Sequence, residues 1–146
     1  MFANPTTLLT ASLLAMGLGS TPDPGPESGL ATPPPTSRLA VLWTSGDREV
    51  ALKVAFMYTL AAKTQGWFDE VQLIVWGPSS HLLSHDTELQ DYVARMQEAG
   101  VEVVACRACA DAYGVTGAIE SLGIEVKYMG QPLTEMLKGD WKVLTF

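Results

Sequence analysis

The sequence predicts an α/β fold with three layers (α/β/α) around a mainly parallel, five-stranded sheet, and three observations support this class. Five short apolar runs alternate with segments of helical periodicity. The first run is continuously apolar and the others are mostly apolar, which is typical of strands buried on both faces. Strands that alternate with helices form doubly wound parallel sheets. The predicted strands are residues 39–43, 71–76, 101–105, 124–129 and 141–146.

The segments between these strands carry helix signals. Two of them begin at an aspartate that can accept hydrogen bonds from first-turn N–H groups, Asp47 and Asp86. The apolar stripe of the first helix comprises Ala51, Val54, Ala55, Tyr58 and Ala62, and that of the second comprises Leu89, Tyr92, Val93 and Met96. Shorter helices are predicted over 106–114, 115–122 and 131–139, whereas residues 77–85 are predicted to be a polar loop.

The first 37 residues differ in composition from the rest of the chain, because all nine lysines and arginines lie from Arg38 onward. Residues 1–19 contain an apolar run of the length of a signal-peptide h-region, but they lack its cationic n-region. Both a cleaved export signal and a non-functional leader therefore stay open. Residues 20–37 hold six of the nine prolines and are predicted to be an extended linker. Residues 38–146 are predicted to be the folded domain.

Composition and charge exclude several classes of function. The chain has 47% hydrophobic residues, enough for a packed core, and its two cysteines are too few for a disulfide scaffold. The formal net charge of −7 argues against nucleic acid as a partner, because phosphate binding needs clustered lysine and arginine. No apolar run is long enough for a stable membrane span. A glycine-rich dinucleotide fingerprint is also missing, so no nucleotide or flavin cofactor is predicted.

The predicted parallel sheet indicates where a functional site should lie. In such a sheet, every loop that leads from a strand to the next helix emerges at the same edge, where open α/β sheets bind their ligands. We therefore expect Thr44–Asp47, residues 77–85 and Cys106–Cys109 to face one crevice. Ser45 and Gly46, in the first of these loops, are predicted to line it.

Both cysteines of the chain occur in one motif, Cys106-Arg107-Ala108-Cys109, directly after the third predicted strand. The start of a helix stabilises a thiolate through its N–H groups and dipole, and Arg107 adds a positive charge nearby. A thiolate attacks disulfides, persulfides and soft metals. Cys109 lies one helical turn from Cys106, where it can resolve a mixed disulfide or a persulfide. The motif therefore makes Cys106 the first candidate for chemistry.

Four interpretations of this cysteine pair stay open. The first is thiol–disulfide exchange, although the motif lacks a Trp-Cys start and Pro132 lies in a helical context. The second is a zinc site with His81 and His85, whose order relative to the cysteines is the reverse of that in common zinc fingers. The third is sulfur transfer through a cysteine persulfide. In the fourth, both cysteines are structural and buried, and the protein is a non-catalytic oligomeric binding or accessory module.

Four segments together resemble the DsrE/DsrF-like sulfur-relay family, which includes DsrE and TusD subunits and YchN-like proteins. The segments are WTSGD, LIVWGPSSHLL, GVEVVACRACADAYGV and LGIEVKYMGQPLTEMLKGDWKVLTF. This resemblance covers essentially all of residues 38–146. It implies a three-layer α/β/α fold, a homo-oligomer such as a trimer or hexamer, and sulfur donor and acceptor proteins as partners. It also implies that Cys106 carries sulfur as a persulfide, whereas Cys109 is not a general feature of the family.

The resemblance bears on two further points. No metal and no organic cofactor is predicted here. The family implies a cytoplasmic location, where thiols stay reduced, whereas a functional leader would imply export.

Overall fold

A computed structural model describes residues 36–146 of the chain. The predicted leader, residues 1–19, and nearly all of the predicted linker, residues 20–37, lie outside the described residues. Within residues 36–146, five strands form one sheet: β1 (Arg38–Trp43), β2 (Glu70–Val75), β3 (Glu102–Cys106), β4 (Glu125–Lys127) and β5 (Trp141–Thr145). The helices are α1 (Arg48–Val50), η1 (Ala51–Ala55), α2 (Phe56–Thr64), α3 (Pro78–His85), α4 (Thr87–Glu98), α5 (Arg107–Tyr113), α6 (Thr116–Glu120) and α7 (Gly130–Lys138).

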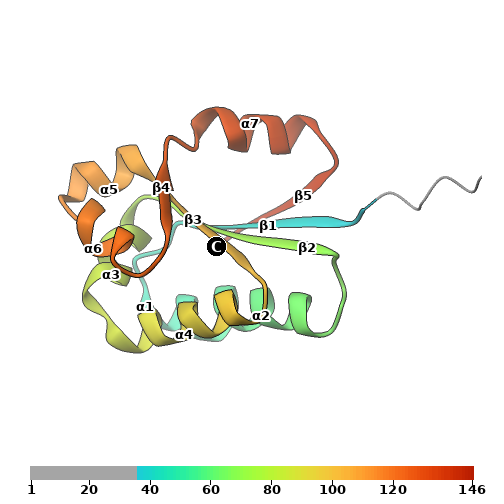
Figure 1. Cartoon of the computed structure of the whole chain (residues 1–146), viewed down its shortest axis with the longest axis horizontal. Helices are drawn as coiled ribbons and strands as arrows, with labels where there is room; N and C mark the ends of the chain where they lie inside the picture. Colours follow the sequence, from blue (N-terminus) through green and yellow to red (C-terminus); the bar gives the residue numbers. More distant parts are fainter. Residues whose placement is uncertain (1–35) are drawn as a thin grey trace, which may run out of the picture. The chain divides into compact units, whose positions relative to one another are not determined.

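The sheet has the strand order β4-β3-β2-β1-β5, and all of its pairings are parallel. The chain moves outward from β1 to β4 and then returns past the whole sheet to place β5 beside β1. Figure 1 shows α7, which makes this return, on one face of the sheet and α2 and α4 on the other. The predicted three-layer α/β/α class with a five-stranded sheet is therefore confirmed, and the sheet is wholly parallel.

The alternating side chains of the strands divide the buried residues into two clusters. The larger cluster lies on the face covered by α2 and α4, and it includes Val41, Leu73 and Val103. The smaller cluster lies toward α7 and consists of Ala40, Ile74, Val104, Cys106 and Met129. Since the buried part of this second cluster is only five residues, the face toward α7 has the thinner core.

The first helical segment departs from its predicted apolar stripe. Ala51, Ala55 and Ala62 are buried as predicted, but Val54 is 40% exposed. The reason is the π-helical turn η1, which adds a residue to the turn and shifts the buried side for the residues that follow. The helix N-caps at Asp47 and Asp86 are confirmed, because both side chains accept first-turn N–H groups.

The prediction of a polar loop over residues 77–85 was wrong, because residues 78–85 form helix α3. Because the sequence of α3 has little apolar periodicity, it did not predict a helix. Pro78 at the first helical position is nevertheless a typical helix start. Its buried side consists of two serines, Ser79 and Ser80, and one apolar residue, Leu83.

Within the described residues, no helix is long and apolar enough to cross a membrane.

Candidate functional site

Cys106 is the last residue of β3 and the N-cap of α5, as predicted. Its side chain is buried, with 3% of its surface exposed, and packs in the smaller apolar cluster beneath α7. The sulfur makes no capping hydrogen bond to the first turn of α5. The predicted position at the start of a helix is therefore present, but the predicted N–H contacts to the sulfur are not made in this structure.

Cys109 lies in the first turn of α5 and is more exposed than Cys106. Both are free thiols. Burial raises the pKa of the Cys109 thiol, and the hydrogen bond with Cys106 raises this pKa further, whereas the backbone N–H of Gly77 lowers it. Cys109 therefore keeps its proton at neutral pH, and its thiol is close enough to Cys106 and to Gly77, the N-cap of α3, for both to shift its pKa.

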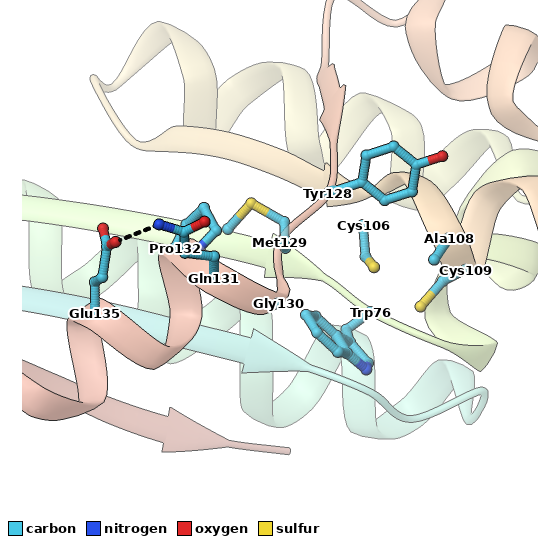
Figure 2. Close-up of a pocket in the computed structure, with 10 residues that line it drawn as sticks. All are labelled: Trp76, Cys106, Ala108, Cys109, Tyr128, Met129, Gly130, Gln131, Pro132 and Glu135. Carbon is cyan, nitrogen blue, oxygen red and sulfur yellow. Dashed lines mark hydrogen bonds between the residues drawn. The ribbon is translucent and has the colours of Figure 1, made fainter.

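A cleft of about 640 Å³ opens above the two cysteines. Figure 2 shows both sulfur atoms directed toward it, between the rings of Trp76 and Tyr128. Its walls come from three chain segments, namely the residue after β2, the β3–α5 junction, and the β4–α7 junction. The residues that line it are Trp76, Cys106, Ala108, Cys109, Tyr128, Met129, Gly130, Gln131, Pro132 and Glu135.

The cleft is mainly apolar, and its rim differs from its floor. Met129 is fully buried on the floor, whereas the Tyr128 side chain is 68% exposed at the rim. Glu135 is the one aspartate, glutamate, lysine, arginine or histidine of the lining, and its carboxylate accepts a hydrogen bond of 2.9 Å from Gln131 (Figure 2). The cleft therefore combines two thiols with apolar walls and places a carboxylate among its lining residues.

Arg107, which was predicted to add positive charge beside Cys106, has other partners. Its guanidinium donates to the carbonyl of Val126 at 2.8 Å and to the carboxylate of Glu120 at 3.1 Å. These contacts tie α5 to β4 and α6. Arg107 is not among the residues that line the cleft.

Ser45 and Gly46 do not line the cleft either. The hydroxyl of Ser45 accepts the N–H of Asp47 at 3.0 Å, and the Ser45 N–H donates to the carbonyl of Phe146. A Cβ added at Gly46 would lie 3.3 Å from that of Pro78, so a small residue suits this approach to α3. Of the three loops predicted to share one crevice, only the cysteine motif lines the cleft. Trp76 also lines it, but residues 77–85 and Thr44–Asp47 do not.

His81 and His85 lie on α3, outside the lining of the cleft. Their ring centroids are 4.5 Å apart, and the ring of His81 is 5.6 Å from that of Tyr113. Within residues 36–146, no three histidine, cysteine or carboxylate side chains converge as metal ligands. The histidine pair and the cysteine pair are therefore separate features.

The sequence patterns did not predict the wall of the cleft that is formed by the β4–α7 junction. The fourth strand was predicted to run to residue 129, but it ends at Lys127, and this places Tyr128, Met129 and Gly130 in a connection. The loop that follows this strand also emerges at the edge of the sheet where open α/β sheets bind their ligands. A shorter fourth strand would therefore have pointed to these residues.

Comparison with known proteins agrees with this architecture. A structure titled as a conserved protein of unknown function, BT1422 from Bacteroides thetaiotaomicron, is 37% identical and has a TM-score of 0.73, over 75% of this chain and 95% of that chain. The YchN protein of E. coli shares the fold at 16% identity and a TM-score of 0.61, over 76% of this chain and all of that chain. No curated protein matches the chain. Residues 37–146 match the DsrE/DsrF-like family throughout, and the chain belongs to this family.

Proposed function

We propose that this protein is a sulfur carrier that holds one sulfane sulfur as a persulfide on Cys106 and passes it to an acceptor. Membership of the DsrE/DsrF-like family supports a role related to sulfur relay in general. The observation that carries the specific proposal is that two free thiols line one open cleft at the carboxyl edge of the sheet.

The loading step is a transfer of sulfur between two thiols. The Cys106 thiolate attacks the outer sulfur of a donor persulfide, R–S–SH. A new sulfur–sulfur bond forms on Cys106, the bond in the donor breaks, and the donor leaves as its thiolate, R–S⁻. Delivery to an acceptor thiolate is the same reaction with the roles exchanged. Neither step needs an oxidant, a metal or a cofactor.

The surroundings of Cys106 suit a stored persulfide. Cys109 stays protonated because its pKa is raised, and its S–H is placed to donate to charge on the Cys106 sulfur. The cleft of about 640 Å³ has room for one more sulfur atom and for the tip of a donor. Because Cys106 is almost fully buried, only a slender group can reach it, and this protects the persulfide from other thiols.

The donor and the acceptor are proposed to be proteins that present a cysteine on a protruding segment.

The carrier itself is proposed to be a homo-oligomer, either a trimer or a hexamer. Two features support self-association. No residue of α7 is buried, and Leu137 on this helix is 64% exposed. Leu144 on the edge strand β5 is also exposed. Light scattering coupled to size exclusion tests this part of the proposal.

Two other functions each have an observation in their favour. The proximity of Cys106 and Cys109 suits thiol–disulfide exchange, and the burial of Cys106 suits a structural role in a non-catalytic module. A redox protein would cycle between dithiol and disulfide with a measurable potential and no sulfur uptake. A structural pair would resist alkylation in the folded protein.

The test uses two variants that each keep one thiol. Cys109→Ser and Cys106→Ser are incubated without oxygen with a small persulfide, and their intact masses are measured after removal of the donor. We expect Cys109→Ser to gain about 32 Da, the mass of one sulfur atom, and Cys106→Ser to gain none. Transfer of this sulfur to an acceptor thiol completes the test. Failure of Cys109→Ser to take up sulfur would overturn the proposal.

A further inference from the structure

We propose that Cys109 gives this protein a second activity, the discharge of a Cys106 persulfide as hydrogen sulfide with formation of a Cys106–Cys109 disulfide. This inference rests on the proposed persulfide on Cys106, but it adds a reaction that a carrier with a single cysteine cannot perform. It would limit how long an undelivered sulfur atom stays on the protein.

The positions of the two sulfur atoms carry the inference. Both cysteines line the same cleft, and Figure 2 shows both sulfurs directed into it. Cys106 is the N-cap of α5 and Cys109 lies three residues on, in its first turn. Residues at this spacing on a helix have Cβ atoms about 5–6 Å apart, and a disulfide needs about 3.5–4.5 Å. A shift of an ångström or two within the first turn closes this gap.

The immediate contacts of Cys109 suit this role. Its thiol is close enough to Cys106 and to the Gly77 N–H for both groups to shift its pKa. Its raised pKa keeps a proton on this sulfur, beside the place where a persulfide would sit. Arg107 takes no part, because its guanidinium is held by Glu120 and the carbonyl of Val126.

The step balances without a further oxidant. The persulfide anion is Cys106–S–S⁻. The proton of the Cys109 thiol passes to the terminal sulfur, the Cys109 sulfur bonds to the inner sulfur, and the bond to the terminal sulfur breaks. The products are the Cys106–Cys109 disulfide and HS⁻. The sulfane sulfur is reduced to sulfide and the two cysteines are oxidised, so a dithiol reductant is needed only for a second turnover.

The experiment follows the fate of one sulfur atom in the full chain. The wild-type protein, Cys109→Ser and Ala112→Ser are each loaded without oxygen with glutathione persulfide and freed of donor. Intact mass and sulfide, trapped with a bimane reagent, are then measured over about an hour, the range of thiol exchange. Ala112 lies on the same helix, is exposed and does not line the cleft, so Ala112→Ser is a matched control that keeps both thiols.

We expect the wild-type protein and Ala112→Ser to lose about 2 Da, the mass of two hydrogen atoms, and to release about one equivalent of sulfide. Cys109→Ser should keep a gain of about 32 Da and release at least tenfold less sulfide. A wild-type protein that keeps its added sulfur as long as Cys109→Ser would overturn the discharge activity and leave the carrier function standing. A Cys109→Ser variant that gains no sulfur, or gains the mass of glutathione, would overturn the carrier function and the discharge with it.

Discussion

Ser79 and Ser80 are neighbours on α3, and both side chains are fully buried, but their hydroxyl groups have different surroundings. The hydroxyl of Ser79 donates to the carbonyl of Trp43 at 2.6 Å and accepts the N–H of Trp76 at 2.9 Å. It therefore joins the ends of β1 and β2 to the start of α3, next to the cleft. The hydroxyl of Ser80 has no hydrogen-bond partner among the described residues.

This contrast gives opposite expectations for two identical substitutions. Ser79→Ala removes the hydrogen bonds of this hydroxyl to Trp43 and Trp76, each with a net value of about 0.5–1.5 kcal/mol. The carbonyl of Trp43 and the N–H of Trp76 keep their bond to each other, so no backbone group is orphaned. We therefore expect a loss of about 2 kcal/mol in the free energy of unfolding. Ser80→Ala removes an unpaired buried hydroxyl and adds a better helix former, so we expect no loss, or a gain of about 1 kcal/mol.

Urea unfolding measures both changes. With a slope of about 1.5 kcal/mol per molar, Ser79→Ala should lower the midpoint by about 1.3 M, and Ser80→Ala should leave it unchanged or raise it. Equal losses in the two variants would show that the volume of the hydroxyl matters here and its hydrogen bonds do not. That result would refute the reasoning.

Three further predictions concern the same region and its supports. Gly77→Ala should cost about 1–3 kcal/mol in urea unfolding, because Gly77 has φ 69° and ψ −133°, a conformation that other residues rarely adopt; an unchanged midpoint would contradict this. Asp86→Ala should cost about 0.5–2 kcal/mol through loss of the α4 N-cap. The pKa of Asp86 is lowered, first by the Leu89 N–H and also by Arg48, so its contribution is complete above the ordinary aspartate pKa and is lost as pH falls through the lowered one. The free energies of unfolding of Asp86→Ala and the wild type should therefore converge as the pH falls into the acid range. A difference that stays constant with pH would contradict the predicted direction. Burial raises the pKa of Cys109, so its contribution to stability is complete below the ordinary cysteine pKa of about 8.5 and falls as pH rises above it. The melting temperature of Cys109→Ser should fall less steeply than that of the wild type as the pH becomes alkaline. Equal falls in the two proteins would count against this.

Sequence patterns predicted the fold class, the chain order of the strands and the position of Cys106, and the physical reason is that these features are local. A buried strand must be apolar along its length, a helix start needs an acceptor such as Asp47 or Asp86, and a parallel sheet places strand ends at one edge. Residues 78–85 were not predicted as a helix because two of the three buried side chains of α3 are serines, and the hydroxyl of Ser79 bonds to the distant carbonyl of Trp43.

The site depended on information that local patterns do not contain. Only the tertiary structure shows that Tyr128 and Met129, rather than Ser45 and Gly46, close the wall around the cysteines. Cys106 is buried because β2 and β4 flank β3 in the sheet and because α7 returns over this face. The charge of Arg107 is taken up by Glu120 and Val126, which are close in space only after β4 has paired with β3. Each of these facts is set by which distant segments pack together, and residue type and spacing along one segment cannot specify that.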